Sequence, residues 1–359
     1  MEESEVTTVI TGGRALVGPN LEPEDEATVV IGDEVILDVG PASDVETPPG
    51  AMHVDATGFT MLPGFIDSHV HIGLADPIEV VGGGVTTVRD LAWSPREIWT
   101  ASTESARANY RGPEILAAGQ MITVPNGYPL RATWAPEHTG RAVRSVAEAR
   151  EAVDEQADSG ACIIKVALNS SAGPTLGAAT LDAIVEAARA RGLRVTGHVY
   201  GLDELQKALD AGMDELAHML MSPESIPAAT VKQMVNQSVT VVPTLSCFFD
   251  GDQTIAVDNL RAFLDAGGRF IYGTDLGNEG PRPGIDPREV DALARAGVTA
   301  TDIVASATAR AADYLDLTDR GALEPGRYAD VAAVLWAPGG EPMELTQVGM
   351  VWRRGRRIR

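Results

Sequence analysis

The residues best suited to chemistry begin with His69 and His71, in the stretch PGFIDSHVH that ends at residue 71. The two histidines are two positions apart at the end of an expected strand, where period-2 geometry directs both imidazoles to the same face. In a barrel, the C-terminal end of a strand is where active-site residues project. The pair is therefore the strongest functional signal, set against the alternative of two hydrogen-bonded histidines near a core.

Further candidates also stand at the ends of short apolar stretches: His198 ends RVTGH, His218 ends DELAH and Asp275 ends RFIYGTD. Each alone has an ordinary explanation, since a lone strand histidine is more often a core residue and an aspartate after Gly-Thr often caps a helix. Together with the first pair, they favour one shared site. The remaining histidines, His53 and His138, are expected to be structural or on the surface, with a weak case for substrate contact by His138.

Lys165 is one of only three lysines in the chain, and it lies within the apolar stretch ACIIKVAL. A buried ammonium beside divalent cations would be repelled by them and expensive to desolvate, so such a lysine must be neutral or chemically converted. A neutral amine can take up CO₂ to become a carbamate, an anion whose two oxygens are able to bridge two metals. The alternative is a lysine that reaches the rim or pairs with a carboxylate.

The elements that must position these residues change in character near residue 61. Residues 1–61 read as short strands punctuated by Gly, Pro and Asp, which predicts a small antiparallel β element. From Met61 onward, short apolar strands alternate with segments of helical period, several of which end in glycine. This pattern predicts an α/β chain with a (β/α)₈ TIM barrel, for which roughly 250 residues is typical. A doubly wound open sheet is the alternative, but no Gly-rich phosphate loop follows the first strand.

Strands return near the C-terminus, in YADVAAVLW and QVGMVWRRGRRI. We therefore expect residues 1–61 and 326–359 to form one composite β-sandwich domain, with the barrel in residues 62–325. The terminal RRGRRIR could bind phosphate or a membrane. A hairpin turned at Gly355, with exposed arginines on either side, is the better explanation.

Composition and charge narrow the class of protein. The 359 residues include 28 Lys and Arg against 51 Asp and Glu, giving a formal charge of −23. This argues against nucleic acid as the main partner, because phosphate binding relies on Lys and Arg. The two cysteines, Cys162 and Cys247, cannot form a disulfide framework and fit a reducing compartment. With no signal peptide or membrane span expected, we predict a cytoplasmic protein with a small-molecule substrate and leave a homo-oligomer open.

On these residues, the chain resembles the metal-dependent amidohydrolase superfamily over nearly its whole length. The motifs that carry the resemblance are PGFIDSHVH, the strand lysine in IIKVAL, GHVYG, ELAHM, YGTD and the terminal ARAADYLDLTDRGALEPGRYADVAAV. Among the branches of the superfamily, the chain is most similar to the imidazolonepropionase-like and Xaa-Pro-dipeptidase-like amidohydrolases.

The resemblance implies two divalent metal ions, usually zinc, bridged by a carboxylated Lys165 and a hydroxide. The ligands that it implies are His69, His71 and Asp275 for one ion, and His198 and His218 for the other. It further implies that the hydroxide attacks a carbonyl, while Asp275 acts first as general base and then as general acid. Tyr200, two residues after His198, resembles the tyrosine that some family members aim at the substrate carbonyl.

The loops after the strands are expected to choose the substrate. Asn169, with the two serines that follow it, could bind polar substrate groups or simply make a turn. The polar and aromatic loop MITVPNGYPLRATWAPEHTG could cover the pocket with Tyr128, Arg131 or Trp134. The segment FFDGDQ is another candidate wall, and the adjacent Cys247 is expected to pack rather than to act as a nucleophile.

These features favour a hydrolase that cleaves an amide bond in a small substrate, whether non-peptide, cyclic or within a dipeptide. One alternative is a mononuclear deaminase or imidazolone-type ring hydrolase that uses mainly the ligands of the first ion and His198. The other is a barrel without catalysis that serves binding or assembly. The intact set of six candidate ligands argues against this last alternative, because binding alone does not require them.

Overall fold

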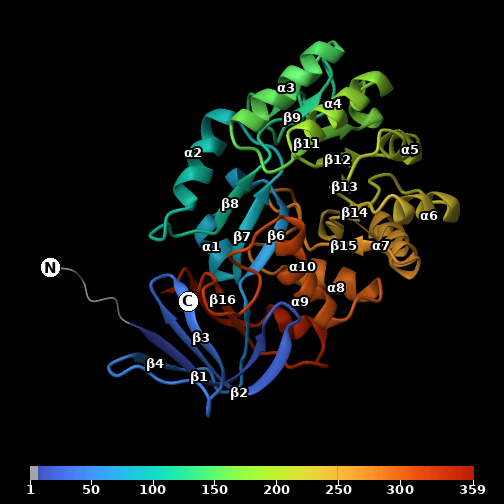
Figure 1. Ribbon diagram of the computed structural model, residues 1–359. Coiled ribbons are helices and arrows are strands. Elements are labelled where there is room, and N and C mark those ends of the chain that lie inside the picture. The colour runs from blue at the N-terminus through green and yellow to red at the C-terminus, as the bar shows by residue number, and fades with distance from the viewer. Residues whose placement is uncertain (1–6, 249) are drawn as a thin grey trace.

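A computed structural model describes residues 7–248 and 250–359 of the chain. Parallel strands alternate with helices through most of it, and a separate sheet joins the two ends of the chain (Figure 1). The mixed α/β class predicted from the sequence is confirmed. Within these described ranges, no helix is long and apolar enough to cross a membrane.

The sheet from the two ends has eight strands, in the order β18-β17-β16-β5-β1-β2-β3 with β4 paired to β1. Its strands are β1 (Thr8–Val17), β2 (Glu22–Gly32), β3 (Val35–Pro41), β4 (Met52–Asp55), β5 (Thr60–Pro63), β16 (Val331–Val334), β17 (Val348–Arg353) and β18 (Arg356–Arg357). The antiparallel ladder of β5 with β16 sets Thr60 opposite Val334 and thereby joins the N-terminal strands to the C-terminal ones. This confirms a sheet shared by both termini, while its closure into a sandwich and the domain boundaries stay predictions.

The C-terminal arginines lie on the predicted hairpin, but only those after Gly355 are exposed as expected: the side chains of Arg353 and Arg354, before Gly355, are 1% and 11% exposed. Strands β17 and β18 pair antiparallel, with Trp352 opposite Arg357. The turn between them contains Gly355 at φ +72°, a left-handed conformation that glycine adopts without steric cost. Trp352 is fully buried beside Ile10 and Met61, so an apolar core holds strands from both ends together.

The remaining strands are parallel and form two further sheets. One has the order β10-β9-β11-β12-β13-β14-β15 and the other β6-β7-β8. Their bounds are β6 (Phe65–Val70), β7 (Val85–Asp90), β8 (Glu114–Ala117), β9 (Met121–Thr123), β10 (Gly140–Ala142), β11 (Ile164–Leu168), β12 (Val195–Val199), β13 (Glu215–Leu216), β14 (Thr240–Val241) and β15 (Arg269–Phe270).

The expected closed barrel is corrected at the level of strand pairing, because isolated backbone hydrogen bonds rather than ladders join the two parallel sheets. At one junction Ser68 N donates to Tyr272 O over 2.9 Å, and at the other Cys162 N donates to Ala117 O over 2.9 Å. The chain turns at Gly119, with φ +81°, directly after β8, and β15 has only two residues. Neither junction therefore continues as a regular ladder.

Helices follow most of the parallel strands and cover their outer side (Figure 1). They are α1 (Pro77–Gly82), α2 (Pro95–Ser105), α3 (Val146–Asp158), α4 (Ala178–Ala190), α5 (Leu202–Asp210), α6 (Ala228–Asn236), α7 (Asp250–Asp265), α8 (Pro287–Arg295), α9 (Ala300–Ser306) and α10 (Ala309–Tyr314). Local signals start several of them: the Ser145 side chain caps α3 by accepting from Glu148 N, and Asp76 caps α1 in the same way. Four short 3-10 helices complete the set: η1 (Ile72–Leu74), η2 (Ser170–Ala172), η3 (Leu245–Cys247) and η4 (Pro342–Thr346).

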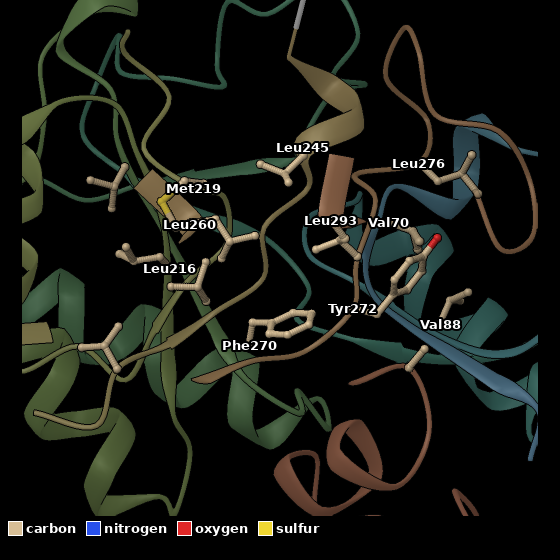
Figure 2. Packing of buried hydrophobic residues seen from close by; sticks show 14 of the residues in the cluster. Val70, Val88, Leu216, Met219, Leu245, Leu260, Phe270, Tyr272, Leu276 and Leu293 are labelled. Atoms are coloured by element: carbon tan, nitrogen blue, oxygen red, sulfur yellow. The ribbon is translucent and has the colours of Figure 1, made fainter. Parts of the chain in front are cut away.

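Apolar side chains from the strands and the helices pack into one large core. Figure 2 shows part of it, where Leu216, Phe270 and Tyr272 lie with Leu260 and Leu293 from the covering helices. All five are at most 3% exposed. This packing holds the strands rigidly, and polar side chains in and just after these strands are therefore held in fixed positions.

Candidate metal centre

All six predicted ligands lie in the parallel strands or shortly after them. His69, Lys165 and His198 belong to β6, β11 and β12, whereas His71, His218 and Asp275 follow the ends of β6, β13 and β15. Each of the six is buried, with at most 5% of its surface exposed. Because parallel strands end at the same side of a sheet, this placement brings residues from five strands toward one point.

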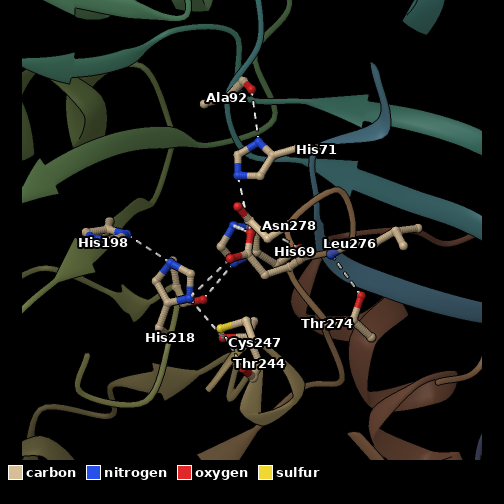
Figure 3. Close-up of polar contacts among 12 residues, drawn as sticks. His69, His71, Ala92, His198, His218, Thr244, Cys247, Thr274, Leu276 and Asn278 are labelled. Atoms are coloured by element: carbon tan, nitrogen blue, oxygen red, sulfur yellow. Dashed lines mark hydrogen bonds and ion pairs between the residues drawn. The ribbon is translucent and has the colours of Figure 1, made fainter. Parts of the chain in front are cut away.

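His69, His71 and Asp275 form the first half of the centre, with one candidate ligand atom from each lying within 4.8 Å of the others. Nδ1 of His69 lies 2.7 Å from Ala217 O, and Nδ1 of His71 lies 3.1 Å from Ala92 O. Since a carbonyl can only accept, both rings carry the proton on Nδ1 and present an Nε2 lone pair to the centre. The two Nε2 atoms stand 3.2 and 3.3 Å from Asp275 Oδ1. Figure 3 shows the rings of His69 and His71, with Ala92 behind the ring of His71.

This first half is an arrangement of acceptors that face one another. Burial lowers the pKa of His69 well below its ordinary value, so its ring stays neutral. Burial also lowers the pKa of His71, but the contact with Asp275 and the charges of Asp275 and Asp90 together raise it, and the net shift is upward. Two imidazole lone pairs aimed at one carboxylate oxygen repel each other unless a proton or a metal cation lies between them. The donor set therefore fits a divalent cation such as zinc.

His198 and His218 form the second half, where Nδ1 of His198 lies 3.1 Å from Nε2 of His218. The outer nitrogen of each ring has its own partner: Asn169 Nδ2 donates to His198 Nε2 over 3.0 Å, and His218 Nδ1 lies 2.8 Å from Thr244 Oγ1. Burial lowers the pKa of His198 to about 3 and that of His218 well below its ordinary value. Because Asn169 donates to His198 Nε2, His198 Nδ1 carries the proton and donates to His218 Nε2, so a hydrogen bond joins the two neutral rings.

Lys165 is fully buried, and its Nζ has no hydrogen-bond partner among the described residues. Burial lowers its pKa to about 7, against the opposing effects of Asp275 and Glu215. A substantial fraction of such amines is neutral near pH 7, which is the form that reacts with CO₂. Its charge lowers the pKa of His69, His198 and His218, which are residues of both halves of the centre.

Two buried carboxylates that the sequence analysis did not select hold the loops of the centre. Asp67 accepts from His69 N over 3.1 Å and from Thr274 Oγ1 over 2.6 Å, so it ties β6 to the loop that carries Asp275. Asp90 accepts from Ile72 N over 2.8 Å and from Ala92 N over 3.1 Å. Asp67 could have been selected from the sequence because it lies two residues before His69. Nothing in the sequence near Asp90 indicates its role.

A buried ion pair lies inside the same strands. Arg89 donates through its guanidinium to Glu215 Oε1 over 2.8 Å and to Ser68 O over 2.7 Å, and neither charged side chain is more than 1% exposed. Arg89 belongs to β7 and Glu215 to β13, so residues 126 positions apart meet here. Sequence reasoning missed this pair, because no local pattern links the two positions.

The backbone is strained where it presents Asp275 and where it leaves β14. Asp275 has φ +61° and Thr244 has φ +47°, both in the left-handed region that residues other than glycine rarely occupy. Asp275 N donates to His69 O over 2.8 Å, which helps to hold this conformation. Such strain is typical of functional sites, where the surrounding structure fixes an unfavourable backbone.

Two aromatic residues of the predicted pocket loop cover the centre. Tyr128 stacks on His198 with ring centroids 4.6 Å apart, and Trp134 lies over His71 with centroids 4.4 Å apart. Trp134 Nε1 donates to the Tyr128 hydroxyl over 3.0 Å, and burial raises the pKa of Tyr128. The loop thus touches both halves of the centre, although Arg131 is exposed and bonds to Asn126 instead.

The remaining residues that the sequence suggested lie partly at the centre and partly outside it. Tyr200 directly follows β12 and is partly buried, and its backbone N donates to Leu168 O over 2.9 Å. Asn169 is held against His198 and also accepts from Ser171, so it is both a contact of the centre and a turn residue. His53 and His138 are exposed, as expected for residues outside the centre.

Cys247 packs against the main core, as expected, but it also lies beside the centre (Figure 3). Its Sγ and one ligand atom each of His218 and Asp275 are within 4.8 Å of one another. Burial raises the pKa of this thiol well above its ordinary value, and the thiol donates to Thr244 O over 2.9 Å. The sequence analysis did not place Cys247 at the centre because its position depends on the fold of the loop after β14.

A model of the amidohydrolase family matches residues 60–356, which is most of the chain. The chain belongs to the amidohydrolase family. The resemblance seen in the sequence motifs is thereby confirmed. Both branches to which those motifs pointed are also found among the similar proteins, as imidazolonepropionase and as Xaa-Pro dipeptidase.

Curated relatives of this amidohydrolase are distant. It is 26% identical over 341 residues to an uncharacterized protein of Mycobacterium tuberculosis, with 83% of this chain and 85% of that protein covered. It is 26% identical over 377 residues to imidazolonepropionase of Streptomyces avermitilis, with 94% and 87% covered. It is 25% identical over 439 residues to ochratoxinase of Aspergillus niger, with 99% and 87% covered.

Solved structures of this amidohydrolase fold are similar over almost the whole chain. A Xaa-Pro dipeptidase with bound methionine has a TM-score of 0.80 at 23% identity, with 98% of this chain and 99% of that one covered. A prolidase complexed with N-methylphosphonate-L-proline has a TM-score of 0.77 at 22% identity, with the same coverage. At these identities the similarity shows the shared fold.

Proposed function

We propose that this amidohydrolase is a metal-dependent hydrolase that cleaves an amide bond in a small molecule, such as a dipeptide, an N-acyl amino acid or a cyclic amide. The observation that carries the proposal is the convergence of buried acceptors, where Nε2 of His69 and of His71 face Asp275 Oδ1 at 3.2 and 3.3 Å. A folded protein tolerates such a buried cluster when a cation neutralises it.

The donor set fits two divalent ions, with zinc favoured by imidazole and carboxylate ligands. His69, His71 and Asp275 would hold one ion, and His198 and His218 would hold the other. Lys165 would bridge them as a carbamate, which supplies the anionic oxygens that a buried amine without a hydrogen-bond partner lacks. Bound ions of this kind polarise a carbonyl and lower the pKa of bound water far below its ordinary value, to about 7.

The chain's own residues supply proton transfer and substrate contacts. Asp275 is the one carboxylate shared by the two three-residue groups of candidate ligands in the described chain, so it is placed to accept a proton from the attacking water. It would then pass this proton to the leaving nitrogen. Tyr128 and Asn169 contact His198. Together with Tyr200, two residues after His198, they would orient the substrate carbonyl and its neighbouring polar groups.

A mononuclear enzyme is the second candidate. It is favoured by the compactness of the first half, where His69, His71 and Asp275 already form a complete three-residue ligand group without His198 or Lys165. One metal in that half would suit a deaminase or an imidazolone-type ring hydrolase. The similarity to an imidazolonepropionase is in keeping with this alternative.

Counting metal ions separates the two candidates. We would grow the full chain with excess zinc and bicarbonate and measure metal per chain by mass spectrometry, for the native protein and for Lys165→Ala. The matched control is Lys232→Ala, at an exposed lysine on α6. We expect close to two ions in the native protein and in the control, and a loss of at least one ion in Lys165→Ala.

The outcomes decide between the candidates. A count of two ions per native chain that decreases in Lys165→Ala supports the binuclear centre. The substrate screen is then directed to dipeptides, N-acyl amino acids and cyclic imides. A count of one ion per chain that does not change in Lys165→Ala favours the mononuclear enzyme, and the screen is then directed to deamination and ring opening. A native protein that takes up no metal overturns both.

A further inference from the structure

The loop after β14 brings a sulfur atom to the metal centre. Thr244, in the left-handed conformation, turns the chain into η3, which ends at Cys247, and Cys247 lies beside His218 (Figure 3). The Cys247 Sγ, a His218 nitrogen and an Asp275 oxygen lie within 4.8 Å of one another. None of the roles assigned above uses the sulfur.

The two oxygens of Asp275 face different neighbours. Oδ1, which is buried and has no hydrogen-bond partner among residues 7–248 and 250–359, faces His69 and His71 in the centre described above. The other oxygen, Oδ2, lies 3.9 Å from His218 Nδ1. A buried carboxylate whose oxygens face imidazole nitrogens and a thiol is a receptor for a cation rather than a satisfied core group.

Hydrogen bonds of the preceding residue, Ser246, fix the position of the Cys247 sulfur. Glu289 Oε2 accepts from Ser246 N over 2.7 Å, and Ser246 Oγ donates to Thr274 O over 3.2 Å. These bonds tie the residue before Cys247 to helix α8 and to the residue before Asp275. The distance between the thiol and the carboxylate is therefore set by the fold and not by a free loop.

We propose that Cys247, His218 and Asp275 form an auxiliary site for a thiophilic divalent cation, with Cd²⁺ or excess Zn²⁺ as its occupants. One sulfur, one nitrogen and one oxygen donor match the preference of these ions for mixed soft and borderline ligands, while Mn²⁺ and Mg²⁺ prefer oxygen. On binding, the S–H bond breaks, a sulfur–metal bond forms and the proton passes to the buffer.

Occupation of this auxiliary site has a consequence that rests on the proposed function. His218 and Asp275 would then serve the auxiliary cation, and they are also residues that the binuclear centre needs. Excess thiophilic cation therefore competes with assembly of that centre. The sulfur site itself requires no catalysis and can be tested by its own spectrum.

The experiment detects binding of the metal by the Cys247 sulfur directly, through an absorption band. The full chain is freed of metal with a chelator, checked for folding by circular dichroism and titrated with CdCl₂, while the ultraviolet absorption of sulfur-to-cadmium charge transfer is recorded. Cys247→Ser is compared with Cys162→Ser, since these are the two cysteines of the chain. We expect the band, with release of one proton per bound cadmium, in the native protein and in Cys162→Ser, and loss of the band in Cys247→Ser.

Either of two results overturns the auxiliary site: no charge-transfer band in the folded native protein, or a band that persists in Cys247→Ser. Loss of the band in Cys162→Ser but not in Cys247→Ser assigns the sulfur to the other cysteine and also overturns it. These results are distinguishable from failure of the proposed function, because the zinc count does not depend on the band. A chain that holds no stable pair of zinc ions but shows the Cys247-dependent band retains the auxiliary site.

Discussion

Neutral imidazoles and a carboxylate face one another at the centre, and the hydrogen bonds behind them determine which atoms do so. Backbone carbonyls of Ala217 and Ala92 fix the proton of His69 and His71 on Nδ1, so that both Nε2 lone pairs point inward. This outer support orients the two rings as candidate ligands and fixes their tautomers. At the scale of single residues, the centre is thus preorganised by bonds to the main chain.

The hydroxyl of Tyr128 is the residue-scale feature most open to test. It accepts from Trp134 Nε1 and therefore keeps its own proton free to donate. If that proton contacts the substrate carbonyl, Tyr128→Phe lowers kcat/KM by roughly 10²-fold, as loss of a carbonyl-stabilising donor does. Steady-state kinetics on a substrate found in the screen would measure this change.

Trp134→Phe serves as the matched control for that prediction. It removes the bond to the Tyr128 hydroxyl but keeps the tyrosine proton, so we expect a smaller kinetic effect than in Tyr128→Phe. Both variants lose one hydrogen bond, which costs about 1 kcal/mol of folding stability. Equal kinetics in Tyr128→Phe and the native enzyme, with only this stability loss, would show that Tyr128 does not touch the substrate.

At the scale of elements, helix α8 and the loop after β14 are joined by a buried carboxyl group. Glu289, near the start of α8, accepts from Ser246 N, and burial raises its pKa to about 8. The side chain is therefore protonated in the folded protein near neutral pH but ionised in the unfolded chain, where its pKa is 4.5. The free energy of unfolding must then fall as the pH rises from about 5 to about 8.

Glu289→Gln tests this pH dependence because the amide keeps the shape of the protonated carboxyl and cannot ionise. We expect the loss of stability between about pH 5 and about pH 8 to shrink by about 2 kcal/mol or more in the variant. Denaturant unfolding at several pH values measures it, with Glu104→Gln at an exposed position of α2 as control. An unchanged pH profile in Glu289→Gln would contradict burial of a protonated carboxyl.

At the scale of the whole molecule, the sheet from both termini is bonded to the body that carries the centre. Gly64 N donates to Asp330 O over 2.8 Å at the junction with β6. Glu114 of β8 is shared by two arginines from the C-terminal region, Arg320 and Arg354, each 3.0 Å away. Bonds that cross between the parts in this way favour unfolding as one cooperative unit.

Trp352→Ala, in β17 of the terminal sheet, tests whether the sheet and the rest of the protein unfold together. Removal of a fully buried tryptophan costs about 3–5 kcal/mol through lost burial and the cavity that remains. Calorimetry should show a single transition at a lower temperature, whereas Met343→Ala, at a residue that is 41% exposed, should change little. A separate early transition, with the remainder of the protein unaffected, would mean that the sheet unfolds independently.

The sequence by itself determined the features that depend on neighbours along the chain. The spacing of His69 and His71, the apolar strand around Lys165 and the alternation of strands with helices are local patterns, from which the α/β class and the shared terminal sheet could be predicted. The full set of six ligands was implied by the family resemblance and stays a prediction. Tertiary structure alone decided the contacts between distant segments. Examples are the pairing of Arg89 with Glu215, the tilted contact of Trp134 with His71 and the approach of Cys247 to Asp275. They depend on strand order and on left-handed turns at Thr244 and Asp275. Periodicity predicts which face a side chain takes within its own element, but which residues meet across elements is set by the packing of the whole chain.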